Sequence, residues 1–172
     1  MLSETDKLEL IAQAARYCKS VRDMGMPINC YAKALREPIF FLWEKKPGMN
    51  KYASTRFRSK SAQNIPDNAG GLIYDHAIPF RYTLERILSL ESIDASSILL
   101  CLEKNLVTCT LTKKENALLN KAGLAFKMPA NWNGVDPLCR YKAVGIKVYE
   151  QNPISELSIN SFKTDAGKAG SG

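Results

Sequence analysis

The sequence contains only one histidine, His76, and few residues suited to binding a transition metal. Its cysteines are odd in number, widely spaced and form no C-x-x-C pair: Cys18, Cys30, Cys101, Cys109 and Cys139. Structural zinc sites and secreted disulfide frameworks need closely paired cysteines or further histidines. The sequence therefore predicts neither, and most of the thiols are expected to act as small core residues.

Long apolar runs and common enzyme motifs are also missing. No stretch of about 18 apolar residues occurs that could span a bilayer, and the polar residues 1–7 do not resemble a secretory signal. We therefore expect a cytoplasmic protein with no membrane partner. The absence of phosphate-binding glycine loops and of a G-x-S-x-G elbow disfavours nucleotide-binding enzymes and serine hydrolases.

The composition, 45% apolar and 24% charged over 172 residues, is typical of one globular domain with a real core. Helical spacing predicts helices at 3–22, 29–46 (interrupted by Pro38), 54–63, 80–90, 94–104 and 112–122, with another starting at Asp136. Alternating or β-branched runs predict strands at 72–74, 105–111 and 145–150. The expected fold is α+β and mainly helical, with a small β element around His76. We divide it into a helical region 1–66, an α+β core 67–165 and a flexible tail 166–172.

The net charge of +7 is concentrated in one segment. Residues 45–66 contain six basic side chains and no acidic one, with two aromatic rings among them: Lys45, Lys46, Lys51, Tyr52, Arg56, Phe57, Arg58 and Lys60. Cationic side chains neutralise phosphates and aromatic rings stack on bases, so this pattern favours nucleic acid as a partner. An acidic protein partner, or a solvated basic loop with its rings turned inward, is the alternative.

His76 follows Asp75 and precedes Pro79 at the end of a predicted strand. Histidine is the only side chain whose unperturbed pKa lies near neutrality, which makes it the natural general base of this chain. The alternative is a structural histidine beside a turn-forming aspartate.

Three motifs follow one another in a recognisable order. Asp75-His76-Ala77-Ile78-Pro79 ends one strand, Asn105-Leu106-Val107 opens another, and the next helix carries Asn116 and Asn120. From about residue 72 to 123 this order resembles the HNH, or ββα-metal, nuclease family. The resemblance implies a ββα element and metal-dependent hydrolysis of phosphodiester bonds in DNA or RNA.

The same resemblance assigns a role to each matched residue. It implies His76 as the general base, Asn105 as the residue that holds the imidazole, and Asp75 with Asn116 or Asn120 as ligands of Mg²⁺ or Mn²⁺. Oxygen ligands suit these ions. As structural alternatives, Asn105 caps a helix or starts a turn, and the two helix asparagines lie at the surface.

The expected function is therefore a metal-dependent, HNH-like endonuclease. Two alternatives stay open, a non-enzymatic nucleic-acid-binding module and an inhibitor or adaptor whose basic face meets an acidic protein. The oligomeric state is left open.

Overall fold

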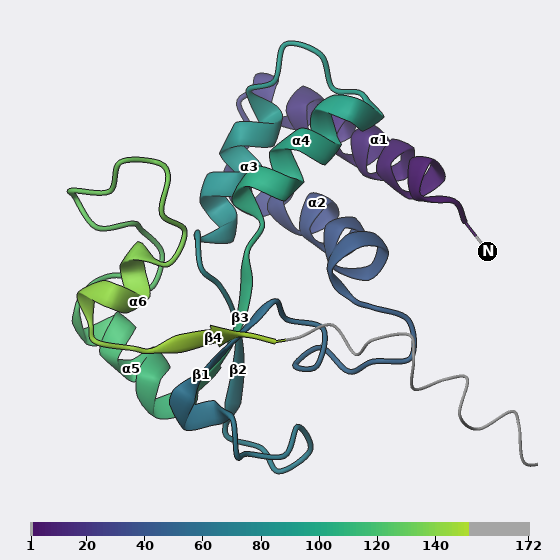
Figure 1. Ribbon diagram of the computed structural model, residues 1–172. Coiled ribbons are helices and arrows are strands. Elements are labelled where there is room, and N and C mark those ends of the chain that lie inside the picture. Colours follow the sequence, from purple (N-terminus) through teal and green to yellow (C-terminus); the bar gives the residue numbers. More distant parts are fainter. Residues whose placement is uncertain (1, 152–172) are drawn as a thin grey trace, which may run out of the picture.

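The computed structural model describes residues 2–151 as one α+β domain, mainly helical, which confirms the expected fold class (Figure 1). The α-helices within this range are α1 (Glu4–Asp23), α2 (Ala32–Ile39), α3 (Phe80–Leu88), α4 (Ala95–Asn105), α5 (Lys113–Lys121) and α6 (Cys139–Ala143). The strands are β1 (Phe57–Ser59), β2 (Leu72–His76), β3 (Thr108–Thr112) and β4 (Val148–Glu150). Three short helical segments complete the fold. They are the 3₁₀-helices η1 (Ile28–Cys30) and η3 (Lys60–Ala62) and the π-helix η2 (Phe40–Glu44).

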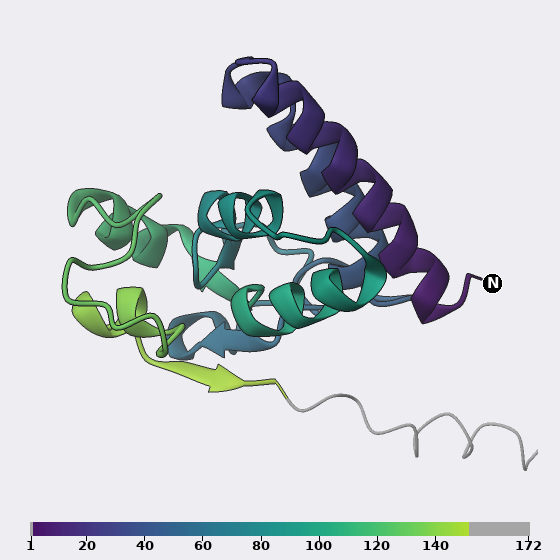
Figure 2. The same ribbon diagram turned by 90° about the horizontal axis from the view of Figure 1, so that it is seen from above.

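Two groups of helices lie on different sides of the sheet. Helices α1 to α4 gather on one side, and α5 and α6 lie on the side away from α1 in both views (Figures 1 and 2). The first group encloses one apolar cluster, which includes Ile11, Leu35, Ile87 and Leu102. The sheet, α5 and α6 enclose a second cluster, which places β2 and β3 between the two cores.

Helix α1 forms where the sequence predicts it. The Ser3 hydroxyl accepts a hydrogen bond from the Asp6 backbone N–H at 3.1 Å, and the Asp6 carboxylate accepts one from the Ser3 N–H at 3.0 Å. This reciprocal capping satisfies two of the N–H groups that every helix start leaves unpaired. Leu8, Ile11 and Ala15 then form part of the buried stripe of the helix.

The predicted helix 29–46 is divided into η1, α2 and η2. Pro38 lies near the end of α2, where its missing N–H weakens the helical ladder, and the chain continues as the five-residue π-helix η2. The wider turn rotates the side chains, so that Glu44 is buried while Phe41 is 59% exposed. The apolar density of residues 39–43 predicts that this stretch belongs to the core, which is wrong for Phe41.

The sheet has the strand order β2-β3-β1-β4 and mixed directions. Strands β2 and β3 are antiparallel, β1 is parallel to β3, and β4 is antiparallel to β1. The short helix predicted at 54–63 is wrong, because β1 and η3 occupy that segment. Strand β1 belongs to the expected region 1–66 but pairs with two strands of the expected core, so the two regions share one sheet.

Other boundaries differ by a few residues from the predictions. Strand β2 extends to His76, and β3 begins at Thr108 rather than at residue 105. Helix α6 begins at Cys139, after Asp136 has accepted a hydrogen bond from the Leu138 N–H at 3.0 Å. The expected tail 166–172 lies outside the described residues.

No helix among the described residues is both long and apolar enough to cross a membrane. All five cysteines lie within the described range, and none of them forms a disulfide there.

Helix α5 begins at a capping box, which the T-x-x-E pattern of residues 112–115 predicts. The acidic member of the box, Glu115, also joins α5 to strand β1. The buried Glu115 carboxylate accepts hydrogen bonds from the Thr112 N–H at 2.9 Å and from the Ser59 hydroxyl at 2.6 Å. We expect Glu115→Ala to lower the free energy of unfolding by about 2–3 kcal/mol, because it leaves buried donors unpaired. Urea denaturation measures this. Glu115→Gln keeps an oxygen acceptor and is the control, and equal stability of the two variants would contradict the explanation.

Candidate active site at the end of strand β2

His76 is the last residue of β2, and its imidazole is held by a carboxylate from the helical layer. The Nε2 atom lies 2.9 Å from Oε1 of Glu44, and both side chains are buried. The rings of Tyr74 and Phe80 lie 5.5 Å from the imidazole, centroid to centroid. Since a carboxylate only accepts hydrogen bonds, Nε2 carries the hydrogen, and Nδ1 is the basic nitrogen of the neutral ring.

Glu44 is placed by the π-helix η2 and was not selected from the sequence. Its side chain is only 2% exposed, and its second oxygen accepts a hydrogen bond from the Tyr74 hydroxyl. Burial, with the nearby Glu44 charge, raises the pKa of Tyr74, so this hydroxyl stays protonated and donates. Tyr74 and His76 are alternate residues of β2, so both side chains point to the same face, where Glu44 lies.

Asp75 lies between these two residues and therefore points to the opposite face of the sheet. Its carboxylate accepts a hydrogen bond from the Tyr141 hydroxyl at 2.7 Å and pairs with the guanidinium of Arg140. Burial raises the pKa of Asp75, while Arg140 and Tyr141 act in the opposite direction. The structure thus separates the Asp75 carboxylate from the His76 imidazole, although the residues are adjacent in the chain.

Arg140 is completely buried and lies at the centre of the polar network around Asp75. Besides Asp75, its guanidinium donates to four backbone carbonyls at 2.6–3.0 Å: those of His76, Ala77, Leu124 and Ala125. This network joins the end of β2 to α6 and to the segment that follows α5. Arg140 could not be selected from the sequence, because no local pattern marks a buried arginine.

The three asparagines of the HNH resemblance lie apart from the imidazole contacts. The side-chain amide of Asn105, at the end of α4, donates to the Cys101 carbonyl at 2.8 Å, one turn earlier. Asn116 is half-buried and Asn120 is exposed on α5. Among the polar contacts of residues 2–151, none connects these side chains to His76 or Asp75.

These residues do not fit a Mg²⁺ or Mn²⁺ site in this arrangement. The Arg140 guanidinium already neutralises Asp75, and a divalent cation beside it would be repelled by that buried positive charge. Residues 2–151 also contain no cluster of three or more histidine, cysteine, aspartate or glutamate side chains that could hold a metal ion. No catalytic step is therefore assigned here to a protein-held metal.

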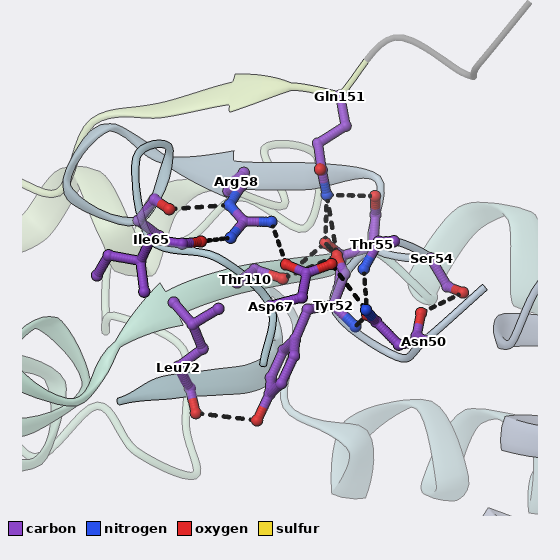
Figure 3. A network of polar contacts seen from close by, with 12 residues as sticks. Asn50, Tyr52, Ser54, Thr55, Arg58, Ile65, Asp67, Leu72, Thr110 and Gln151 are labelled. Atoms are coloured by element: carbon purple, nitrogen blue, oxygen red, sulfur yellow. Dashed lines mark hydrogen bonds and ion pairs between the residues drawn. The ribbon is translucent and has the colours of Figure 1, made fainter. Parts of the chain in front are cut away.

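The basic segment divides into structural and exposed side chains. Arg58 is largely buried and binds Asp67 at 2.8 Å and the Ile65 carbonyl at 2.7 Å, so it closes the loop after β1 (Figure 3). The Tyr52 hydroxyl donates to the Leu72 carbonyl at 3.1 Å, and Phe57 packs against the second apolar cluster. The remaining basic residues of the segment are exposed: Lys45, Lys46, Lys51, Arg56 and Lys60.

Two open grooves are lined by the two partners of the Tyr74–Glu44 hydrogen bond. The Phe41 groove, about 400 Å³ in volume, is lined by side chains that include Arg36, Phe41, Lys51 and Tyr74. The Trp43 groove, about 340 Å³, is lined by side chains that include Trp43, Glu44, Lys46, Arg56 and Thr108. Each groove thus combines an aromatic ring with cationic groups. Tyr74 of the first groove is hydrogen-bonded to Glu44 of the second, so one contact of the site links the walls of the two grooves.

Comparisons with models of protein families, with curated proteins and with solved structures find no match to this chain.

Proposed function

We propose that this protein cleaves phosphodiester bonds in nucleic acid, with His76 as the general base. The observation that carries the proposal is the buried Glu44–His76 pair, whose carboxylate also lines a groove with the exposed amine of Lys46. An imidazole oriented by a buried carboxylate is the arrangement that general-base catalysis uses. We also propose that the protein acts in the cytoplasm, as the sequence leads us to expect.

Each residue of the site has a separate role in the proposed hydrolysis. His76 takes a proton from water at Nδ1 while the water oxygen bonds to phosphorus and the P–O bond to the leaving oxygen breaks. The leaving oxygen takes a proton from the solvent, and Glu44 fixes the ring and stabilises the positive imidazolium that forms. Lys46 supplies positive charge for the phosphate oxygens, and Arg56 adds to it when it leaves its exposed ion pair with Glu150. Opposite charge placed where negative charge develops lowers the barrier most in a site that excludes water.

The order of elements around His76 supports the same proposal. Strand β2 ends in Asp75-His76, β3 pairs with it in antiparallel fashion, and α5 follows β3 directly. This is the strand, strand and helix order that the HNH resemblance implies, with α3 and α4 inserted between the strands. A Mg²⁺ or Mn²⁺ ion in this proposal arrives with the substrate phosphates, as Mg²⁺ commonly does.

A cleavage assay tests the proposal. The purified protein is incubated with single- and double-stranded DNA and RNA in Mg²⁺, in Mn²⁺ and in EDTA. We expect His76→Ala to reduce cleavage by about 10²–10⁴-fold, the usual contribution of a general base. Circular dichroism and urea denaturation establish that the variant is folded.

Asn120→Ala is the matched control, because Asn120 is exposed on α5 and has no role in the proposed chemistry. Its cleavage rate should equal that of the wild type. Cleavage that survives in a folded His76→Ala protein would contradict the assignment of the base, and no cleavage of any substrate would contradict the function.

A second candidate is a nucleic-acid-binding protein without catalysis. The observation that favours it is that both carboxylates near His76 already have protein partners. Glu44 is hydrogen-bonded to two side chains, and Asp75 is neutralised by Arg140. This candidate predicts binding to DNA or RNA with no cleavage under any of the ionic conditions above.

A further inference from the structure

We propose that the ligand of this protein is single-stranded nucleic acid, with successive bases stacked on Phe41 and Trp43. This inference rests on the proposed function, because it names the substrate class of the same site. It assigns the stacking role to two rings outside residues 45–66, the segment in which the sequence placed Tyr52 and Phe57.

Phe41 has the properties of a stacking platform. The residue is 59% exposed although it is apolar and lies in an apolar stretch. The ring of Phe40 packs edge-on against it, with centroids 5.0 Å apart, and Phe40 packs in the same way against Tyr74 at 5.8 Å. An exposed ring that is supported from one side loses little conformational freedom when a base covers its other side.

Trp43 offers a second ring two residues further along η2. It is partly buried against the helical core and lines the groove that contains Lys46 and Arg56. Tyr52 and Phe57 are less suited, since Tyr52 is bonded to the Leu72 carbonyl and Phe57 packs against the core. The exposed aromatic surface beside the cations therefore comes from η2.

The Phe41 groove has the excess of positive charge that a nucleic-acid backbone needs. Arg36 and Lys51 line it, and Glu37 is its only acidic side chain. The Trp43 groove also offers two cations, Lys46 and Arg56, but Glu44 and Glu150 balance them. Cations neutralise phosphates, and aromatic rings bind bases of any sequence through their faces. A duplex hides its base faces in its own stack, so rings in shallow grooves favour a single strand.

The π-helix connects this surface to the proposed chemistry. Phe41, Trp43 and Glu44 belong to one five-residue segment, and Tyr74 in the wall of the Phe41 groove donates to Glu44 in the wall of the Trp43 groove. Bases stacked on Phe41 and Trp43 would place the phosphodiester between them beside the Glu44–His76 pair. Wide helical turns of this kind are often found at functional sites.

Binding measurements test the inference separately from catalysis. Fluorescence anisotropy is measured in EDTA for His76→Ala protein with a labelled 20-nucleotide oligo(dT), an oligo(rU) of the same length and a DNA duplex. We expect Phe41→Ala to weaken binding of the single strands by about 5- to 150-fold, the converted value of one lost base–aromatic stack. Phe41→Trp should restore the affinity.

Phe126→Ala is the matched control, because Phe126 is 85% exposed and lines neither groove. It should bind as the parent protein does. Equal single-strand affinity of the Phe41→Ala protein, or tighter binding of the duplex than of either single strand, would overturn the inference. Tight single-strand binding that depends on Phe41, with no cleavage by the wild type, would support it while contradicting the proposed function.

Discussion

An Arg140→Met protein is expected to lose about 3–5 kcal/mol of free energy of unfolding, the usual cost of removing one partner from a buried ion pair. The substitution leaves the Asp75 carboxylate without its counter-charge and removes the donor to four carbonyls. Methionine fills much of the volume of the arginine side chain. The lost free energy of unfolding therefore comes from the polar network rather than from a new cavity. Urea denaturation at pH 7 measures the change.

Two further variants decide whether the buried network is responsible. Arg56→Met removes an exposed ion pair with Glu150, whose side chains are 58% and 57% exposed, and should cost less than about 1 kcal/mol. Adding Asp75→Leu to Arg140→Met removes the stranded carboxylate and should recover part of the lost stability. Equal effects of the two arginine substitutions would contradict the proposed role of Arg140.

Glu44→Gln is expected to reduce the proposed cleavage activity by about 10²–10⁴-fold while the protein stays folded. In the wild type, Glu44 accepts from both His76 and Tyr74 and so keeps the hydrogen on Nε2. The glutamine amide has the same shape but only one oxygen, and its NH₂ group favours the imidazole tautomer with a bare Nε2. That tautomer lacks a basic Nδ1, and a carboxylate-to-amide change of this kind has a large effect in catalytic triads.

Nitrogen NMR gives a readout that a merely structural role would not change. The chain has one histidine, so every imidazole signal reports His76, and the variant should shift from the Nε2–H tautomer toward the Nδ1–H tautomer. Glu150→Gln is the control for the tautomer, because Glu150 lines the same groove without bonding to His76. An unchanged tautomer or an unchanged cleavage rate in Glu44→Gln would contradict the role given to Glu44.

The parts of the fold that the sequence predicts correctly are those that local contacts determine. Ser3, Asp94 and Thr112 each precede a helix and accept from a backbone N–H three residues later. Such signals lie within one turn of the chain, and apolar spacing supplies the rest. Local pattern also predicts strand β2, although the prediction ends at Tyr74 and the strand continues to His76.

The site was harder to predict because its contacts are distant in sequence. Glu44 and His76 are bonded across 32 positions, and Asp75 and Arg140 across 65. No local pattern indicates that Asp75 would be neutralised from α6, so adjacency to His76 suggested a shared site. Strand β1 was missed for the same reason, since three residues form a strand only when both neighbours are present.

The strand order has a consequence for how the protein folds. Phe57 pairs with Cys109 on one side and with Glu150 on the other. Pairing strands that are distant in sequence costs loop-closure entropy before most of the contacts form. Such a sheet therefore folds more slowly than a helical bundle. The helices can form early, but β1 becomes an interior strand only after β4 has been synthesised. During synthesis on the ribosome, the Trp43 groove, which Glu150 and Gln151 help to line, should therefore be completed late, when the last strand joins the sheet.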